Sequence, residues 1–282
     1  INAGAALGTI LVGYLGETIG WGYGFGLAGI GMLAGLIVFV LGKSALNGAG
    51  EAPAPLAKST EWLLYAIGVL SVGVIWFLIQ YQDIIQSLLI VSGLALLGYV
   101  LYETFKLPKE PRERMFAILF LISLNPLFWG LFEQAGGSMS LFTDRYVDRG
   151  GTPASLFQSI NPIYIILLAP LFAMLWQWLG AKGKEPSAPA KFGLALAQMG
   201  LANLVLVWGA EAYGIAAMTP VLFVFLYYLL ATTGELCLSP VGLSAMNRLA
   251  PSYLASLIMG AWFYMTAVGN FVAGKIGEAT GG

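Results

Sequence analysis

The sequence predicts an all-α protein that crosses a lipid bilayer many times. Charged residues make up only 10% of the chain, whereas a soluble domain carries about 25%. Hydrophobic residues make up 59%, and the mean hydropathy is +0.82. The apolar residues also fall into segments that match the roughly 20 residues a membrane-spanning helix needs. These observations exclude an ordinary soluble domain.

Nine segments have, or nearly have, the length and composition of a spanning helix. In chain order they cover residues 1–16, 24–42, 62–82, 84–102, 115–143, 154–181, 192–210, 212–247 and 252–274. The linkers 43–60 and 182–191 are rich in Ala, Pro, Gly and Lys and are predicted to be solvated. Glu17, Asp83 and Glu211 border apolar segments and are predicted to be loop charges.

Lys and Arg are distributed unevenly between alternate loops. Of the 13 basic residues, only Arg145, Arg149 and Lys275 belong to one set of loops, and the other set holds the rest. Because basic residues concentrate on the cytoplasmic side of membrane proteins, the larger set is predicted to be cytoplasmic. The first segment then runs outward, and the chain ends outside the cytoplasm.

Two glutamates lie inside apolar segments that contain no other charge. Glu133 lies in the segment 115–143 and Glu235 in the segment 212–247. A carboxylate at membrane depth is costly, and such residues usually face a polar cavity and take part in moving a solute or an ion. The chain has no histidine, so any proton carrier must be a carboxylate, and His-based metal sites are excluded.

Sequence signatures of enzymes are missing. We find no Walker loop, no Cys/His metal spacing and no Gly-x-Ser-x-Gly elbow. The chain is therefore predicted not to be an enzyme and to need no cofactor. An ion gradient is the expected source of energy.

Helical spacing places polar or aromatic side chains on one face of each of four segments. These sets are Trp129, Glu133 and Gly137; Gln158, Asn161 and Ile165; Thr232, Glu235 and Ser239; and Trp262, Thr266 and Asn270. If the four faces converge, they form a wet cavity with two acids, amides and indole rings. Such a cavity suits a small zwitterionic solute with a cationic amine.

Other interpretations of these residues stay open. Asn161 precedes Pro162 and could only complete the hydrogen bonding of a broken helical turn. Trp129 and Trp262 could face lipid or anchor the membrane interface. The two glutamates could pair with basic residues on helices outside the chain.

Several runs of residues resemble proton-dependent oligopeptide transporters of the major facilitator superfamily. Residues 125–138 (NPLFWGLFEQAGGS), continuing to Asp144 and Arg145, resemble the seventh helix of that family. Residues 1–5, 13–17 and 20–25 are similar to its fifth and sixth helices, residues 234–242 (GELCLSPVG) to its tenth, and residues 260–263 (GAWF) with 269–270 to its eleventh. The resemblance covers essentially the whole chain.

The resemblance implies a division of the chain. Residues 1–42 would end the N-terminal bundle, and 43–61 and 103–114 would be cytoplasmic linkers. Residues 62–102 would be a helix pair inserted in bacterial members, and 115–282 the C-terminal bundle with the seventh to eleventh core helices. Nine of an expected fourteen helices are thus present. The first four core helices and the twelfth, the chain's expected partners, would lie outside it.

The resemblance also implies roles for single residues. Asn2, Asn161 and Glu235 would hold the amino terminus of a di- or tripeptide. Trp129, Trp262 and Phe263 would shape side-chain pockets, and Ser239 would line the cavity. Glu133 would pair with an arginine of the first core helix, which lies outside the chain, and together with Glu235 it would respond to protonation. Asp144 would contribute to the outer gate.

The expected function is proton-coupled symport of di- and tripeptides by alternating access in the bacterial inner membrane. The expected partners are peptides, protons and the lipid bilayer, and no nucleic acid. One alternative is a related symporter of another small solute, such as a sugar or nitrate. The other is a membrane scaffold subunit that transports nothing, in which case both glutamates should tolerate neutralisation.

Overall fold

A computed structural model describes residues 1–49, 51 and 54–280 of the chain. Its elements, in chain order, are α1 (Asn2–Thr18), α2 (Trp21–Leu41), η1 (Lys43–Leu46), α3 (Lys58–Gln80), α4 (Gln82–Lys106), α5 (Lys109–Phe132), η2 (Glu133–Gly136), α6 (Ser138–Tyr146), β1 (Val147–Asp148), η3 (Ala154–Ser159), α7 (Ile160–Ala181), α8 (Ala188–Ala217), β2 (Thr219–Pro220), α9 (Leu222–Leu249) and α10 (Ala255–Thr280). The elements labelled η are 3-10 turns. The all-α class predicted from the sequence is confirmed.

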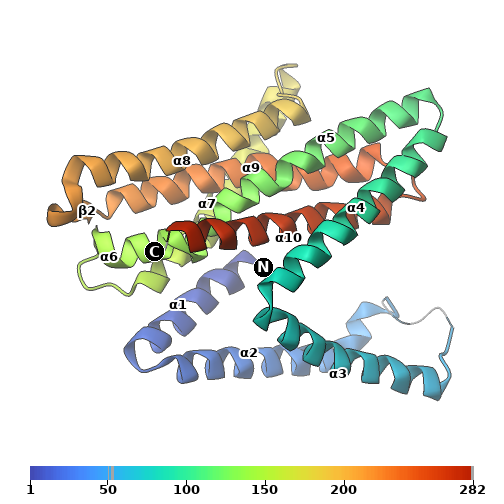
Figure 1. Cartoon of the computed structure of the whole chain (residues 1–282), viewed down its shortest axis with the longest axis horizontal. Helices are drawn as coiled ribbons and strands as arrows, with labels where there is room; N and C mark the ends of the chain where they lie inside the picture. The colour runs from blue at the N-terminus through green and yellow to red at the C-terminus, as the bar shows by residue number, and fades with distance from the viewer. Residues whose placement is uncertain (50, 52–53, 281–282) are drawn as a thin grey trace. The chain divides into compact units, whose positions relative to one another are not determined.

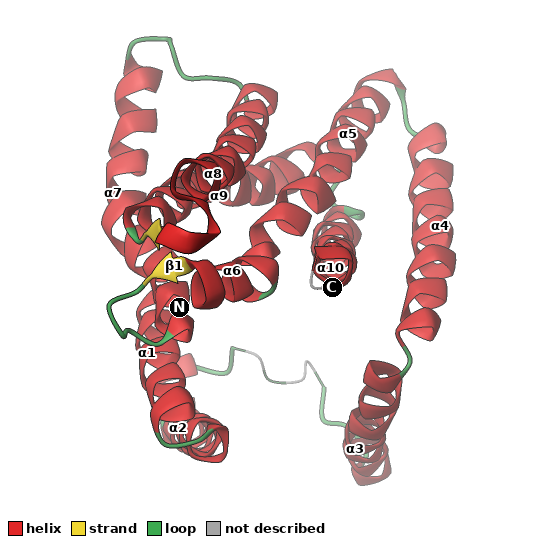
Figure 2. Cartoon of the chain, turned by 60° about the vertical axis from the view of Figure 1, so that its left-hand side comes forward, coloured by secondary structure: helices red, strands yellow, loops and turns green. Residues whose placement is uncertain are grey.

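The described chain forms two compact units. The larger unit comprises Ile1–Gly26 and Tyr102–Gly282, and the smaller comprises Leu27–Leu101. In the larger unit α8 packs along α9, and α5 packs along α10 (Figure 1). Helix α7 packs on α9, and α1 packs on η3 and α7 (Figure 2). These contacts bring the helices that carry the predicted site residues into one bundle.

The interior of the larger unit is aromatic. Phe128 of α5, Phe192 of α8, Tyr227 of α9 and Trp262 of α10 are each at most 2% exposed. In the smaller unit, by contrast, α3 has no buried residue, and its apolar side chains face outward. Outward-facing apolar side chains are expected where the surrounding solvent is lipid.

Eight helices of the described residues are long and apolar enough to cross a membrane. Helix α1 has 17 residues and corresponds to the first, short segment predicted from the sequence. A parallel pairing of β1 with β2 joins the segment after α6 to the turn between α8 and α9. This two-residue pairing is the only sheet in the described part of the chain.

The structure corrects the prediction that residues 115–143 form one helix. Helix α5 ends at Phe132, a 3-10 turn follows, and α6 begins at Ser138. Gly136 and Gly137 are poor helix formers, and Gly137 leaves the helical region with ψ −110°. Glu133 therefore lies at a break between two helices, and Gly137 does not continue the face of α5 that carries Trp129.

The predicted segment 212–247 is also wrong at its start. Helix α8 continues through Ala217, and α9 begins only at Leu222. Met218 has a positive φ of 55°, and Pro220 has no N–H to donate to a helical hydrogen bond. The chain reverses at these residues.

The three predicted loop charges lie within helices. Glu17 belongs to the last turn of α1, Asp83 to the first turn of α4, and Glu211 to α8. Helices extend beyond their apolar portions, so a charge that borders an apolar segment does not mark the end of the helix.

Candidate functional site

Helices α7 and α9 meet through a hydrogen-bonded cluster of three polar side chains. The Nδ2 of Asn161 donates to the Oγ1 of Thr232 at 3.0 Å and to Glu235 Oε2 at 2.9 Å. Thr232 is fully buried, whereas Asn161 and Glu235 are half-buried. Asn161 is the second residue of α7, where Pro162 is tolerated because the first-turn N–H groups have no partner inside the helix. The first turn of α7 thus aims an amide at the acid of α9.

Glu133 lies close enough to this cluster to interact with it through its charge. The carboxylate acts electrostatically on Glu235 and on the hydroxyl of Tyr227, both in α9. An aromatic cluster precedes it, in which the ring centroids of Trp129 and Phe132 lie 5.2 Å apart. The two glutamates predicted from the sequence therefore lie within range of each other's charge.

Several buried polar side-chain atoms on α5 and α9 have no hydrogen-bond partner within the described chain. Among the described residues, Asn125 Oδ1, Trp129 Nε1 and Tyr227 OH are buried in this way. Buried polar atoms are almost always satisfied by protein or by water. Asn125 and Trp129 belong to α5, which leads to Glu133, and Tyr227 belongs to α9, which carries Glu235.

Trp262 is held inside the bundle. It is 2% exposed, and its ring packs against Gly242 of α9 and lies edge to face with Phe192 at 6.0 Å. A Cβ atom at position 242 would lie 2.2 Å from the indole. The adjacent Phe263 is exposed.

The remaining predicted residues are spread over the larger unit. Asn2 of α1 and Ser239 of α9 are half-buried. In the described part of the chain, neither they nor Phe263 hydrogen-bond with the Asn161–Glu235 pair. The structure thus joins Asn161 with Glu235 directly and Glu133 with Glu235 electrostatically. It adds no direct contact for the other three.

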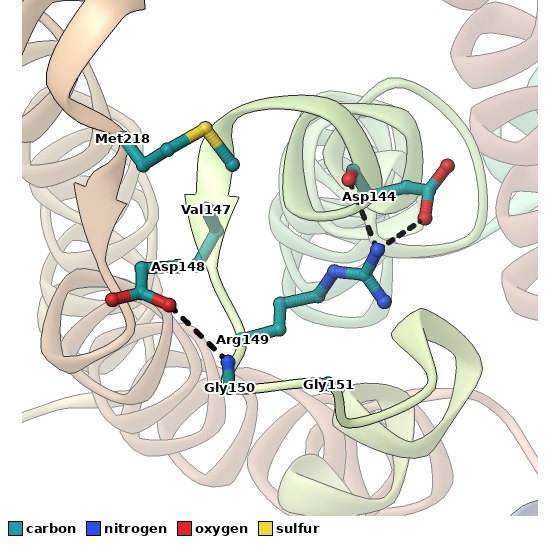
Figure 3. Close-up of a pocket in the computed structure, with 7 residues that line it drawn as sticks. All are labelled: Asp144, Val147, Asp148, Arg149, Gly150, Gly151 and Met218. Carbon is teal, nitrogen blue, oxygen red and sulfur yellow. Dashed lines mark hydrogen bonds and ion pairs between the residues drawn. The ribbon is translucent and has the colours of Figure 1, made fainter.

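Asp144 lies apart from these residues, at the end of α6. It accepts a hydrogen bond from Arg149 Nη2 at 2.7 Å and contributes to a cavity of about 310 Å³ (Figure 3). In Figure 3 the guanidinium points to Asp144, while Asp148 points to the backbone N–H of Gly150. None of the predicted substrate-binding residues lines this cavity.

Two buried amides were missed as site residues. The Nδ2 of Asn125 donates to the backbone carbonyl of Trp262 at 3.0 Å and to Thr266 Oγ1 at 3.2 Å. Gln134 connects α5, α6 and α10. Their signal in the sequence was an uncharged polar side chain inside an apolar segment. This signal is weaker than that of a charged residue. The physical basis is the same, because burying any polar group without a hydrogen-bond partner costs free energy.

Glu17 also makes a contact that the sequence did not indicate. Its carboxylate accepts hydrogen bonds from the backbone N–H groups of Ala154 at 3.1 Å and Ser155 at 2.8 Å, at the start of η3. Burial acts to raise the pKa of Glu17. Hydrogen bonding from Ser155 and Ala154 and the charge of Arg149 outweigh it, so the pKa lies below its ordinary value of 4.5.

Comparison with known proteins supplies the context for this geometry. The profile of the POT family (PTR2) matches residues 1–280. The peptide transporter YePEPT of Yersinia enterocolitica is 34% identical over 98% of this chain and 59% of its own length. The uncharacterized transporter YclF of Bacillus subtilis is 32% identical over 98% of this chain and 58% of its own length. The chain therefore spans less than two thirds of these relatives.

Solved structures share the arrangement of helices. A mutant of a peptide transporter POT in complex with alafosfalin superposes with a TM-score of 0.81 at 32% identity, covering 99% of this chain and 59% of that one. A POT family transporter in complex with 5-aminolevulinic acid gives a TM-score of 0.82 at 28% identity, covering 99% and 61%. All four of these relatives are transporters.

Proposed function

The chain belongs to the POT family, and from this membership we propose that the full-length protein is a proton-coupled symporter of di- and tripeptides. It moves its substrate without converting it chemically, and the proton gradient rather than a cofactor supplies the energy. Alternating access arises from two bundles that rock around a site near the middle of the membrane.

The observation that carries this proposal is the hydrogen bond between Asn161 and Glu235. Asn161 orients a carboxylate that lies half-buried inside an apolar helix bundle. A carboxylate held in this way is suited to accept a charge-assisted hydrogen bond from the ammonium group of a peptide. Solved relatives bound to alafosfalin and 5-aminolevulinic acid support a small polar substrate.

The other site residues complete the proposed binding cavity. Asn2 joins Asn161 and Glu235 at the peptide amino terminus, and Ser239 lines the cavity. Side-chain pockets of the peptide are assigned to Trp129, Trp262 and Phe263. Since Trp262 is packed in the bundle, its part is to shape the wall behind Phe263, which is exposed.

Coupling to protons is assigned to the pair of glutamates. Glu133 and Glu235 interact electrostatically, so the charge on one affects proton binding by the other. Protonation of Glu133 at the break between α5 and α6 would then alter both the local charge and the attraction of Glu235 for an amine. Asp144, at the far end of α6, is assigned to the outer gate.

The two alternative functions, a symporter of another solute and a scaffold subunit, predict different solute binding. A sugar or nitrate symporter would bind its own solute, and peptides would not compete for the site. Nitrate has no ammonium group that could bind to Glu235. A scaffold subunit would bind none of them and would tolerate neutral residues at both glutamates. Binding of a dipeptide, a sugar and nitrate to the purified full-length protein separates the three.

A double cycle tests the proposed contact with the amino terminus. Glu235→Gln should weaken binding of a dipeptide by about 1.5–3 kcal/mol, the usual net contribution of a hydrogen bond to a charged group, or roughly ten- to hundredfold in affinity. An N-acetylated dipeptide should bind poorly to the parent protein and lose little further on mutation. Isothermal titration of the four combinations gives the coupling. Additive effects would mean that Glu235 does not contact the amine.

A further inference from the structure

The break between α5 and α6 is fastened by a buried carboxamide. Helix α5 ends at Phe132. The N–H of Glu133 still bonds to the carbonyls of Trp129 and Leu131, but the α-helix supplies no further donors beyond this residue. Gln134 lies in the 3-10 turn that follows and is 6% exposed. Its side chain therefore lies beside the last turn of α5, where it can donate to the carbonyl of Gly130.

The carboxamide bridges three helices. Its Nε2 donates to the carbonyl of Gly130 in α5 at 2.9 Å and to the carbonyl of Ala273 in α10 at 3.2 Å. Its Oε1 accepts a hydrogen bond from Ser138 Oγ, at the start of α6, at 2.7 Å. Both N–H groups and the oxygen are thus used, and both sides of the break are tied to α10.

Small residues allow α10 to come within reach of this carboxamide. A Cβ at Gly130 would lie 3.3 Å from Val272 Cγ1, and one at Gly269 would lie 2.8 Å from Trp129 Cβ. Helices approach this closely only where side chains are absent. Helix α10 therefore forms a fixed support beside the break, and Gln134 attaches the break to it.

We propose that Gln134 is a positioning residue for Glu133. The two residues are adjacent in one 3-10 turn, so the bonds of Gln134 fix the backbone from which the Glu133 side chain projects. That orientation sets the distance from Glu133 to Glu235 and Tyr227 and so determines the pH at which the carboxylate changes its charge. This inference rests on the proposed function, in which Glu133 responds to the proton.

In the part of the chain that the structure describes, few charged groups surround Glu133. On α9 its neighbours are Glu235 and Tyr227, with Tyr228 beside Tyr227. On α6 the carboxylate of Asp144 is paired with Arg149, and the helix also carries Arg145 and Tyr146. On α10 Lys275 is paired with Glu278, and the helix also carries Tyr264. The basic and acidic residues of α5, Lys109 to Arg114, lie in its first two turns, and Glu110 pairs with Arg114. Within the described part of the chain, the titratable groups that act on Glu133 are therefore its neighbours on α9.

The first arm of the test measures the attachment itself. Gln134→Leu keeps a similar side-chain size and removes all three hydrogen bonds, and Ser138→Ala removes only the one to Oε1. Gln198→Leu is the matched control, because Gln198 is a half-buried amide of α8 that bonds to Leu194 and Cys237. Hydrogen exchange of the full-length protein should show faster exchange at residues 130–138 for Gln134→Leu, a smaller change for Ser138→Ala and none for the control. Unchanged exchange in Gln134→Leu would overturn the proposed attachment.

The second arm measures the consequence. In liposomes, the pH at half-maximal proton-driven uptake of a dipeptide should shift by about one unit or more in Gln134→Leu, a change comparable to the spread of carboxyl pKa values among protein environments. Peptide exchange at constant pH should change less than proton-driven uptake, and the control should match the parent. Faster hydrogen exchange with an unshifted pH profile would overturn the positioning role. If the parent shows no proton-driven uptake, the proposed function falls, and the first arm still decides whether the attachment exists.

Discussion

At the scale of single residues, the candidate site depends on how an apolar helix bundle accommodates the carboxyl groups of Glu133 and Glu235. Glu235 is stabilised by the amide of Asn161, which donates to it while also bonding to Thr232. Glu133 has no such amide donor among the described residues and lies at a helix break instead. The two acids thus differ in their surroundings: Glu235 accepts a hydrogen bond from an amide, and Glu133 has no such donor in the part of the chain that the structure describes.

Glu133→Gln tests this difference. A permanently neutral side chain of similar shape removes the group that responds to the proton but leaves the cavity in place. Proton-driven uptake should therefore fall far more than peptide exchange or counterflow, both measured in liposomes with the full-length protein. Glu211→Gln, at an exposed position of α8, is the control and should match the parent. An equal loss in both assays would favour a purely structural role for Glu133.

The sequence pointed to the two acids and to Asn161, but not to the buried amides of Asn125 and Gln134. Glu133 and Glu235 are conspicuous because each is the one charge in a long apolar segment. Asn125 and Gln134 carry no charge, and their partners on α10 lie 137 to 141 residues away in the chain. No helical spacing relates α5 to α10, so these pairings depend on tertiary packing. All assignments of residues to the substrate, the proton and the outer gate stay predictions. They concern Asn2, Trp129, Glu133, Asp144, Asn161, Glu235, Ser239, Trp262 and Phe263.

At the scale of elements, the crossing of α5 and α10 supports the site. A Cβ at Gly269 would lie 2.8 Å from Trp129 Cβ and 3.2 Å from the carbonyl of Pro126. Neither the Cβ of Trp129 nor the carbonyl of Pro126 can move aside by a change of rotamer. A side chain at position 269 would therefore force the two helices apart. The contact therefore couples the position of α10 to that of Trp129 and to the break after Phe132.

Gly269→Ala should destabilise the protein by about 1–3 kcal/mol, the usual cost of overpacking. The measurement is thermal unfolding in detergent, with peptide affinity as a second readout. Gly260→Ala is the matched control on the same helix, since a Cβ there meets nothing within 4 Å. Equal melting temperatures for the two variants would contradict the close crossing.

The contact between α1 and η3 predicts a pH dependence. Because the folded-state pKa of Glu17 lies below its ordinary value of 4.5, the ionised form stabilises the contact. That stabilisation is fully present above 4.5 and is lost as the pH falls through the lowered value. Glu17 is largely exposed, so its contribution to the free energy of unfolding is expected to be about 0–1 kcal/mol, the range for surface charge contacts.

Amide exchange measures this dependence directly. Protection of the Ala154 and Ser155 N–H groups, corrected for intrinsic exchange, should be high at neutral pH and decrease on acidification below 4.5. In Glu17→Ala it should be low throughout. Protection that is independent of pH in the parent protein would refute the role of the carboxylate.

Hydropathy predicted the apolar segments but could not predict where the helices break. The segment 115–143 is continuous in apolarity yet divides at Glu133–Gly137, and the segment 212–247 hides the reversal at Met218–Pro220. Hydropathy reports which residues prefer lipid and not how the backbone is directed. Gly136-Gly137 and Thr219-Pro220 were the local signals.

At the scale of the whole molecule, the class of an all-α membrane protein was predictable from composition. Helices that face lipid need apolar side chains, so the chain is rich in apolar residues and poor in charged ones. The expected major facilitator fold is confirmed by TM-scores of 0.81 and 0.82 with solved POT transporters. The chain is a multi-pass protein of the bacterial inner membrane. Its orientation, from the distribution of Lys and Arg, and its division into two bundles and an inserted helix pair stay predictions. Neither can be read from helix lengths alone.

Proton-driven uptake tests the central claim most directly. The full-length protein would be reconstituted in liposomes and given a labelled dipeptide under an inward proton gradient, with and without a protonophore. The dipeptide should accumulate above its external concentration, and the protonophore should abolish the accumulation without preventing equilibration. A solute gradient cannot be built without an energy source, and the proposed source is the proton. Equal uptake with and without the gradient, or no uptake above empty liposomes, would contradict proton-coupled peptide symport.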